Sequence, residues 1–569
     1  MYQKFENYLL AVLNSSSKKK LFLWLTLAAF ILSIAMIPTE LVMAKMLPGK
    51  NNDTYSVYID LPSGSSIEQT QRVSQCVTTI LQKEPEALDM EVFLGSGSPL
   101  DFAGLIKGSH FKNSENVAEV VLNLTKKHDR SEPSYMMVQR LRPEIQKQCE
   151  NIIPQTNIKF IEPPAGPPTM AAIVAEVYGS NALGIRQLSE RIKGVFQQTK
   201  GLVDIDIMQD EIFEKFEVRV NSDKIARSGL DIKHVNDILY LAFEGMSIAV
   251  KNSSEVSEQI PIFLVLDPAS KKFSSKDLNA ISLKLSSLKL MNSMGMMIPL
   301  TEVVEIVSVK SNPMIVTKNL HQMTNVLAET DMVSQVYPLM DARNVILDTF
   351  TDNYEIHKIG LFNLELIDKK SKERYELIWD GEMEVTLDTF VDLGGAFIAA
   401  LVLIFLLMVI YYKSFVLSGI ILLGSFLSIV GVLFGHFIMD LFTADTFFLT
   451  ATSLIGFIAL IGISSRNSLL LIDFTKSLMV DKGMPKKEAI SYAAATRAKP
   501  IFLTAAAIIL ASTLLASDAV FGGLGVSLIF GTIAAVVASL IVVPILLDNS
   551  NLEKHFNFHE RKAVSIIEP

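Results

Sequence analysis

The chain has 569 residues, of which 50% are hydrophobic and 20% are charged, and its mean hydropathy is +0.35. It is too apolar for an ordinary soluble protein and too charged to lie wholly in a membrane, so we expect two environments to share it. The formal net charge is −9 and the basic residues cluster beside apolar runs, which argues against a nucleic-acid-binding protein.

Six apolar stretches are long enough to cross a bilayer, which requires about 20 mostly apolar residues. We predict membrane spans at residues 21–41, 391–411, 415–438, 447–472, 500–517 and 524–547. The first span follows Lys18, Lys19 and Lys20, as the apolar part of a signal peptide would. It is long and lacks a convincing small-residue cleavage site, so we interpret it as an uncleaved anchor.

Basic residues beside the spans predict their orientation, because lysine and arginine prefer the cytoplasmic side. The three lysines before the first span place the N-terminus inside, so residues of about 46–388 emerge on the other side. The loop at 475–499 is basic, whereas the loop at 440–445 carries only acidic charges. The C-terminal tail carries Lys554, Arg561 and Lys562, and we therefore expect both termini in the cytoplasm.

The region between the first two spans repeats a strand, helix, strand order. YSVYIDL (55–61) alternates like a strand, and Ser65 and Glu68 form a capping-box pattern before a helix. The order recurs from 117–124 through a helix near 134–149, and again from 173–179 through a helix near 182–199. These repeats predict split βαβ, ferredoxin-like subdomains. The fold class we expect is an α-helical membrane protein with an α+β domain outside the membrane.

The Pro-rich PPAGPP at 163–168 separates the second repeat from the third and is a natural boundary. We predict a cytoplasmic amphipathic helix with the first span, two outer subdomains, an inserted lobe, a five-helix bundle and a tail. Their expected ranges are 1–47, 48–165, 166–238 with 326–390, 239–325, 391–548 and 549–569.

Cys76 and Cys149 are too few and too far apart in sequence to indicate a metal site or a disulfide framework, and a single bridge stays open. MNSMGMM (291–297) offers thioethers that could bind a soft metal such as Cu(I). Methionines around a glycine turn are more often adaptable packing, so we expect no metal site there. No segment resembles a GxxxxGK[ST] phosphate loop, which argues against ATP as the energy source.

The fourth span contains Arg466 deep in the apolar string LIGFIALIGISSRNSLLLIDF (454–474). A cation near the bilayer centre costs about 2.5–3.5 kcal/mol on insertion scales, so it normally has a partner and a role. The alternative is that Arg466 snorkels to the cytoplasmic interface. Asp473 lies seven residues on, on the same face but two turns nearer the cytoplasm, and we expect it at the interface.

The fifth span is entered through RAKPIFLT (497–504), in which Arg497 and Thr504 are seven residues apart and share a helix face. Each has a simpler interpretation. Arg497 can be a cytoplasmic anchor, which physics alone favours, and the Thr504 hydroxyl can bond to its own helix.

The strings in the last five spans resemble the last five helices of RND (resistance-nodulation-division) efflux permeases, especially their acriflavin-resistance branch. The matching segments are DLGGAF-to-IDF (392–474), GMPKKEAI (483–490), RAKPIFLT (497–504) and VFGGLGVSLIFG (520–531). LPSGSS (61–66), DFAG (101–104) and PPAGPP are similar to that family's outer pore and docking region. The resemblance covers essentially the whole chain, but a full permease has two such halves, and this chain resembles the C-terminal one.

The resemblance implies functional residues at specific positions. In that family a basic residue in the fourth of these spans, with an arginine and a threonine on the next helix, forms a proton relay with acidic residues of the first half. These positions correspond to Arg466, Arg497 and Thr504. Many drug pumps have lysine where Arg466 stands; since arginine keeps its proton, the titrating groups here should be carboxylates and Arg466 their counter-ion. Phe102 and Gly104 resemble a flexible loop along the drug path, with a packed surface turn as the alternative.

Charge accounting predicts that the partner of Arg466 lies on another chain. Asp392 lies near the outer end of the second span, Asp473 near the cytoplasmic end of the fourth, and Asp518 in a loop. The resemblance suggests a separately encoded N-terminal half as the source, because Met1 matches the point between the sixth and seventh spans of a full permease.

The resemblance therefore implies a proton-driven efflux subunit of the bacterial inner membrane that exports amphipathic or lipophilic compounds. It implies no enzymatic chemistry and no cofactor beyond the proton gradient. The implied partners are the N-terminal half, a trimer-like assembly, a periplasmic adaptor, an outer-membrane channel and the lipid bilayer. The alternatives are an exporter of metal ions or envelope lipids, and a truncated membrane scaffold that does not transport.

Overall fold

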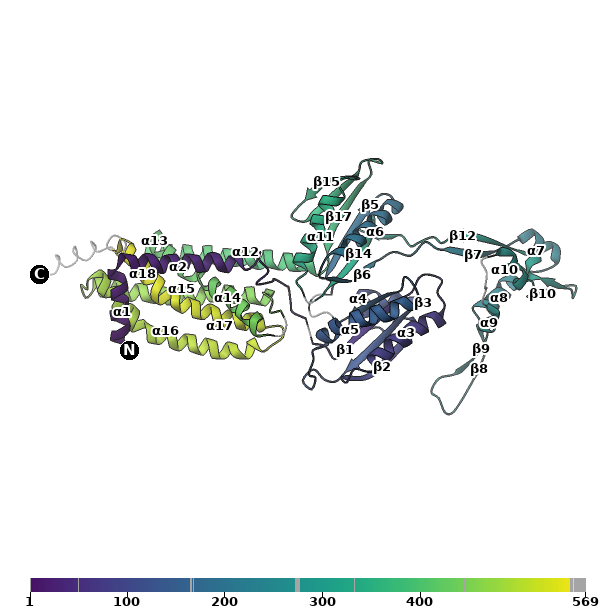
Figure 1. Cartoon of the computed structure of the whole chain (residues 1–569), viewed down its shortest axis with the longest axis horizontal. Helices are drawn as coiled ribbons and strands as arrows, with labels where there is room; N and C mark the ends of the chain where they lie inside the picture. Colours follow the sequence, from purple (N-terminus) through teal and green to yellow (C-terminus); the bar gives the residue numbers. More distant parts are fainter. Residues whose placement is uncertain are drawn as a thin grey trace. The chain divides into compact units, whose positions relative to one another are not determined.

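The computed structural model divides the chain into two compact units, residues 1–209 with 315–569, and residues 210–314 (Figure 1). It describes the whole chain except residues 1, 50, 164–165, 167, 272–276, 332, 444–445, 553–555 and 557–569. Part of the predicted PPAGPP boundary and the tail charges Lys554, Arg561 and Lys562 lie outside the described residues.

The first subdomain outside the helix bundle is an antiparallel sheet covered by two helices. Its elements are β1 (Thr54–Asp60), α3 (Ile67–Leu81), β2 (Ala87–Ser96), the short α4 (Phe102–Lys107), β3 (Asn113–Leu124), α5 (Ser134–Cys149) and β4 (Asn157–Ile161). The strand order is β2-β3-β1-β4, so each βαβ unit is split by a strand of the other. The capping box of α3 lies at Ser66 and Gln69, one residue later than predicted, because Ser66 holds the extended backbone that an N-cap needs.

A disulfide joins α3 to α5. It links Cys76 and Cys149, whose Cα atoms are 5.7 Å apart, and closes a loop of 73 residues. The bridge therefore ties together the two helices whose apolar residues pack in one core with the sheet. Disulfides form in oxidising compartments, which agrees with the predicted location of this subdomain outside the cytoplasm.

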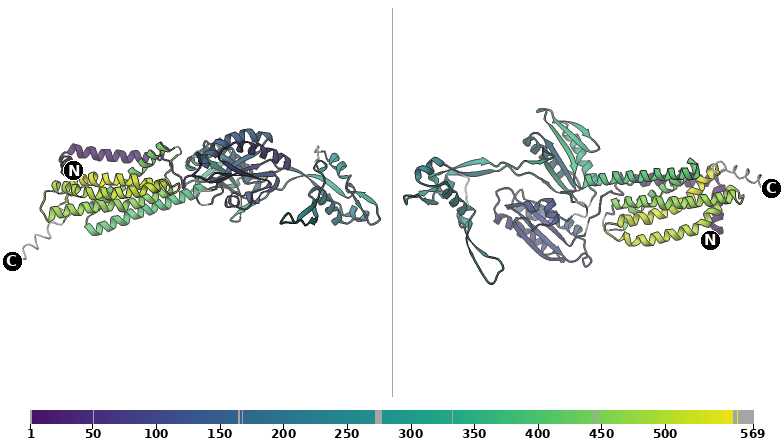
Figure 2. Two further views of the ribbon diagram at one scale, coloured as in Figure 1. Left: turned by 90° about the horizontal axis from the view of Figure 1, so that it is seen from below. Right: turned by 180° about the vertical axis from the view of Figure 1, so that it is seen from behind.

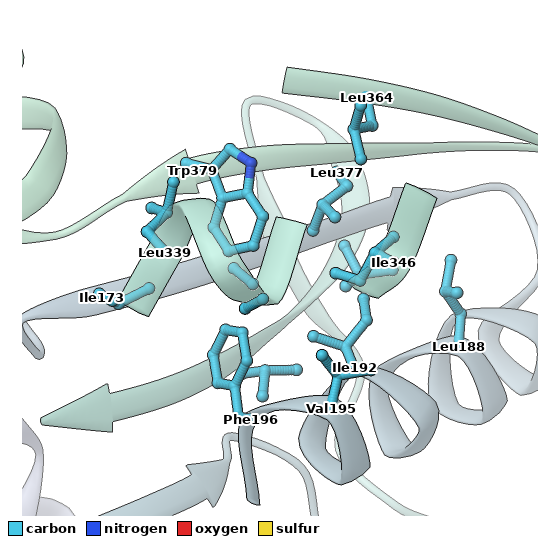
Figure 3. Packing of buried hydrophobic residues seen from close by; sticks show 14 of the residues in the cluster. Ile173, Leu188, Ile192, Val195, Phe196, Leu339, Ile346, Leu364, Leu377 and Trp379 are labelled. Atoms are coloured by element: carbon cyan, nitrogen blue, oxygen red, sulfur yellow. The ribbon is translucent and has the colours of Figure 1, made fainter. Parts of the chain in front are cut away.

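The second subdomain has the larger sheet, in the order β13-β14-β5-β17-β16-β15, with β6 also paired to β14. Its elements are β5 (Ile173–Gly179), α6 (Ala182–Gln198), β6 (Leu202–Ile207), β13 (Val316–Lys318), β14 (His321–Thr330), α11 (Val336–Thr349), β15 (Tyr354–Ile359), β16 (Asn363–Asp368) and β17 (Arg374–Asp380). Apolar residues of α6 and α11 pack against this sheet (Figure 3). Phe196 stacks on Trp379 with ring centroids 6.2 Å apart, near the end of β17.

The unit 210–314 is built around a two-stranded ribbon of β7 (Glu214–Val220) and β12 (Val304–Lys310). Between them lie α7 (Ser222–Ser228), α8 (Ile232–Phe243), β8 (Met246–Lys251), β9 (Ile260–Leu264), α9 (Pro268–Lys271), α10 (Leu278–Leu285), β10 (Lys289–Met291) and β11 (Met297–Pro299). We predicted a lobe at 239–325; the unit starts earlier because β7 pairs with β12, and it ends earlier because β13 and β14 belong to the other sheet. Met291 and Met297 pair across the β10–β11 hairpin and are exposed.

Five helices in the described part of the chain are long and apolar enough to cross a membrane. They are α12 (Glu382–Tyr412), α13 with α14 (Phe415–Phe426 and Ser428–Phe442), α15 (Ala451–Val480), α16 (Lys486–Ala516), and α17 with α18 (Gly522–Val537 and Val543–Asn549). A π-helical segment, Ala538–Val542, interrupts the last of them. Helices of 28–31 residues measure about 42–46 Å, so their ends extend beyond a hydrocarbon core of about 30 Å. Both views of Figure 2 show them alongside one another.

The first predicted span is helical as α2 (Ser16–Ala35), which follows α1 (Tyr2–Asn14). The helix ends at Ala35, before the predicted end at residue 41, and α2 is not among the five long apolar helices. Leu21, Trp24 and Leu25 are exposed, so this helix presents an apolar surface to its surroundings.

Glycines let the bundle helices approach closely. A Cβ atom on Gly431 of α14 would lie 2.3 Å from the backbone oxygen of Phe530 on α17, and one on Gly531 would lie 2.2 Å from Cδ1 of Leu460 on α15. Such close contact of backbones through small residues is typical of helix packing in membranes.

One glycine joins the second subdomain to the bundle. β17 ends at Asp380, α12 begins at Glu382, and Gly381 between them has φ +92° (Figure 1). A Cβ atom there would lie 2.6 Å from the carbonyl oxygen of Ala171, so both the backbone angle and the space require glycine.

Candidate proton-coupling site

Arg466 lies at the middle of α15, which runs from Ala451 to Val480. Its side chain is exposed, although Ser465 and Asn467 beside it are buried. Lys476, the next basic residue, is ten positions or about 15 Å further along the helix, and an extended arginine side chain reaches about 7 Å. Side chains on a helix also tilt toward its N-terminus, here away from the end that carries Lys476. The geometry therefore disfavours snorkelling of Arg466 to the C-terminal end of α15, which is the end that we predict to be cytoplasmic.

The face of α15 that carries Arg466 is not covered by other parts of the described chain. Ile455, Ala459, Gly462, Arg466 and Leu470 are all exposed and recur at spacings of three or four residues, which places them on one face. Among the described residues, Arg466 has no hydrogen bond and no ion pair. The structure thus places a permanent cation at mid-span on an uncovered apolar face.

Arg497 packs against α15 from the neighbouring helix α16. Its guanidinium carbon lies 5.2 Å from the ring centroid of Phe474, a cation–π contact, and its Nε is buried without a hydrogen-bond partner in the described part of the chain. This contact sets the relative level of the two antiparallel helices. From that level, Arg466 is eight residues or about 12 Å toward the N-terminus of α15, and Thr504 is seven residues or about 10.5 Å toward the C-terminus of α16.

Arg466 and Thr504 therefore lie at nearly the same level along the two helices, with Arg497 nearer the end of α15 that carries Asp473 and Lys476. The Thr504 hydroxyl donates to the carbonyl oxygens of Pro500 and Ile501, at 3.1 and 3.0 Å, which is the self-bonding alternative considered above. Among the described residues no hydrogen bond joins Arg466, Arg497 and Thr504. The helices bring the three side chains to adjacent levels but do not complete a network within this chain.

Of the carboxylates Asp392, Asp473 and Asp518, the last two are engaged elsewhere. Asp473 accepts a hydrogen bond of 2.7 Å from the Tyr412 hydroxyl and one of 3.4 Å from Tyr411, at the C-terminal end of α12. Asp518 accepts from two backbone N–H groups in the loop between α16 and α17, and Asp392 is exposed near the other end of α12. None of these carboxylates is paired with Arg466.

Residues 1–548 match the AcrB/AcrD/AcrF family. The chain belongs to this family. The swarming motility protein SwrC of Bacillus subtilis (strain 168) is 21% identical over 541 residues, which cover 92% of this chain and 45% of SwrC. The multidrug resistance protein MdtC of Erwinia tasmaniensis is 23% identical over 370 residues, covering 64% of this chain and 32% of MdtC.

A crystal structure of a heavy metal efflux pump has the same fold, with a TM-score of 0.70 and 18% identity over 96% of this chain and 52% of that one. The chain thus spans about half the length of SwrC and of this pump. Together these matches identify it as an RND superfamily permease chain, and RND permeases are inner-membrane proteins.

In this RND chain the segment compared with a flexible loop is the short helix α4. The Asp101 carboxylate caps it by accepting from the Gly104 N–H at 2.6 Å, and a Cβ on Gly104 would lie 2.7 Å from that oxygen. Phe102 is 59% exposed, and Leu105 and Phe111 are exposed near it. The segment is ordered by its cap and glycine and presents an apolar surface.

His436 is a buried ionisable residue that the sequence reasoning missed. It lies on α14, where its Nδ1 is 2.9 Å from the carbonyl oxygen of Val432 and its Nε2 is 2.8 Å from the hydroxyl of Ser453. A histidine inside an apolar string was the available signal. Because both ring nitrogens have partners, and Ser453 is 13 residues or about 20 Å from Arg466 on α15, it is not part of the candidate site.

Proposed function

We propose that this chain is the C-terminal half of a proton-driven RND efflux permease that exports amphipathic or lipophilic compounds. The observation that carries the proposal is Arg466, a mid-span cation on an uncovered helix face with no carboxylate partner in the described part of the chain. A charge there costs about 2.5–3.5 kcal/mol in lipid unless it is paired. A partner helix carrying carboxylates would remove that cost and complete the site.

In this proposal Arg466 remains charged and the carboxylates of the partner titrate. When they are ionised they pair with Arg466, and when they take up protons from the outer side the pairing weakens. Thr504, at the same depth, can turn its hydroxyl from its own helix to the carboxylate, and Arg497 supplies a second cation one level nearer the cytoplasm. Transport of this kind involves no covalent chemistry, so the chain is not an enzyme and uses no cofactor beyond the proton gradient.

The partner we propose is a separately encoded N-terminal half. With α2 as a further span, the chain contributes six spans, its exposed apolar residues facing lipid or the partner and both its termini lying in the cytoplasm. Three such pairs would assemble around a periplasmic funnel and join an adaptor and an outer-membrane channel, as RND pumps generally do.

The substrate class is supported by the exposed apolar residues of the segment at 102–111. Phe102, Leu105 and Phe111 are 59%, 47% and 72% exposed, an apolar surface that an amphipathic molecule could follow. MdtC is named a multidrug resistance protein, which agrees with this class. The solved structure of a heavy metal efflux pump keeps metal export as a second candidate. The exposed methionines of the β10–β11 hairpin are the residues of this chain that favour it.

Two substitutions at Arg466 test the relay. Arg466→Ala leaves the partner carboxylates without a counter-ion in a medium of low dielectric constant. Proton-linked efflux should therefore fall on the order of 100-fold, although the variant is present in the membrane at the wild-type level. Arg466→Lys retains the charge and should retain partial activity. Lys476→Ala is the matched control, because it removes an exposed cation near the cytoplasmic end of the same helix. Wild-type efflux by Arg466→Ala would overturn the assignment.

Purification of the tagged chain from its native host tests the partner. Recovery of a half-permease with acidic residues in its membrane helices, and efflux only when both chains are present, would support the proposal. A homo-oligomer that transports alone would refute the proposal. A chain that is inserted in the membrane but shows no transport, alone or with any partner, would be the membrane scaffold.

A further inference from the structure

A small cavity lined by charged residues lies where four parts of the larger unit meet. Its volume is about 140 Å³, and its walls come from both outer subdomains, from the linker after α2 and from the first turn of α12. We call its charged side chains the charged junction: Lys45, Lys107, Arg142, Glu162, Glu329 and Glu382. None of them belongs to the candidate proton-coupling site.

Two cations of the first subdomain bind carboxylates of the second across this junction. Lys107, the last residue of α4, pairs with Glu329 on β14. Arg142 on α5 pairs with Asp204 on β6 at 3.1 Å and with Asp331, just after β14, at 3.2 Å. The pairs are largely buried, so they are less screened than surface ion pairs and hold the two subdomains together.

Within the described part of the chain, two further carboxylates of the junction form no ion pair. Glu162 accepts one hydrogen bond, of 3.2 Å, from the Ser134 hydroxyl. Glu382, the first residue of α12, has neither a hydrogen bond nor an ion pair among the described residues. Lys107 and Arg142 are already paired, so Lys45 alone is left to balance two carboxylates.

The surroundings of Glu162 favour its neutral form. Burial raises the pKa of Glu162 to about 7 from an ordinary 4.5, and the nearby negative charge of Glu329 adds to the rise. Arg142, Lys45 and the bond from Ser134 act in the opposite direction but do not cancel it. Glu382 faces Lys45, Lys107 and Glu329 in the same cavity.

We propose that the charged junction is a latch that links closure of the two outer subdomains on α12 to proton uptake by Glu162 and Glu382. With both carboxyls neutral, the ion pairs of Lys107 and Arg142 hold the subdomains together. With both ionised, the excess negative charge repels within a small cavity, competes for the cations of the two ion pairs and draws in water, and the subdomains separate.

Proton linkage sets the direction in which pH changes the closing equilibrium. The closed conformation holds the Glu162 proton more tightly than an open, hydrated one, whose carboxyl would titrate near 4.5. Closure is therefore fully favoured below pH 4.5, and that advantage is lost as the pH rises to about 7. A difference of about 2.5 pKa units weakens the closing equilibrium about 300-fold across this window, from Glu162 alone.

The latch would connect the helix that bears Phe102 with a membrane helix. Lys107 ends α4, whose first residue is the exposed Phe102, and Glu382 begins α12. The protonation state of one cavity could thus set both the exposure of the apolar α4 surface and the position of the first turn of α12. This inference concerns motion within the chain and does not depend on export.

The test measures the separation of the two subdomains against pH in the purified full-length chain. Spin labels at Leu88 on β2 and Leu183 on α6, both exposed, report the distance between the subdomains. We expect a short, narrow distance distribution at pH 5 and a longer, broader one at pH 8. Glu162→Gln with Glu382→Gln should keep the short distance at both pH values.

Two further variants keep the result interpretable. Lys107→Gln removes one ion pair and should lengthen the distance at pH 5. A short distance in the double glutamine variant could not come from unfolding, because an unfolded chain would give a long and broad distribution. Glu132→Gln is the matched control, because Glu132 belongs to an exposed ion pair with Arg140 in the first subdomain, and it should keep the wild-type pH response. A wild-type distance that does not change with pH, or a double glutamine variant that still responds, would overturn the latch whatever the chain transports.

Discussion

Removal of the disulfide between Cys76 and Cys149 should destabilise the first outer subdomain by about 4 kcal/mol. The bridge closes a loop of 73 residues, and the chain-entropy relation for that length gives this value at 25 °C. Cys149 is fully buried in the core, so alanine is the appropriate replacement at both positions, because it buries no new polar group. A loss of 4 kcal/mol corresponds to an increase of about 10³-fold in the opening constant.

Amide hydrogen exchange of the full-length chain measures this loss locally. Core amides of β1 and β3 should exchange about 10³-fold faster in the double alanine variant, whereas those of β5 in the second subdomain should be unchanged. Reductant should produce the same change in the wild-type chain and none in the variant. Equal effects on β1 and β5 would refute the reasoning that the bridge constrains only its own subdomain. A loss of stability below about 1 kcal/mol would refute the magnitude expected from the loop length.

Two further predictions concern the membrane part. Gly431→Ala places a methyl group 2.3 Å from the Phe530 carbonyl oxygen and should lower the stability of the bundle by about 1–3 kcal/mol in a detergent unfolding assay, whereas Gly419→Ala, with open space around it, should not. A cysteine replacing Leu88, with the native disulfide intact, should react with an impermeant thiol reagent from the periplasmic side, and one replacing Lys482 should not. Labelling of position 482 from outside would reverse the proposed orientation.

The sequence allowed the prediction of the apolar helices because burial in lipid leaves a direct mark on composition. It located the spans at 391–411 and 500–517, but the helices begin at Glu382 and Lys486. Hydropathy reports the part of a helix that lies in hydrocarbon, and the polar turns that continue the helix into water are invisible to it. The first span shows the opposite difference: α2 ends at Ala35, before residue 41, because the chain turns over residues 36–40, which include Pro38.

The candidate site was predictable only where one residue carried the argument. Arg466 is anomalous in any apolar helix, and the lack of an accompanying carboxylate could be counted along the sequence. The contact of Arg497 with Phe474 depends on the relative level of two helices, which no periodicity records. The charged junction and the disulfide were still harder to predict from the sequence, because they join residues brought together by the folding of split βαβ units. Glu162 and Glu382, for instance, are separated by 220 positions.

The junction at Gly381 has a mechanical consequence. A strand whose Trp379 is stacked on Phe196 in the core leads, after one residue, into a helix of 31 residues about 46 Å long. The helix is thus attached at its first residue to a rigid sheet. A tilt of the helix by about 5° about that attached end would displace its other end, at Tyr412, by about 4 Å sideways. Because Tyr412 holds Asp473 on α15, a small rotation of the outer sheet would be felt by the helix that bears Arg466 without any flexible segment absorbing it.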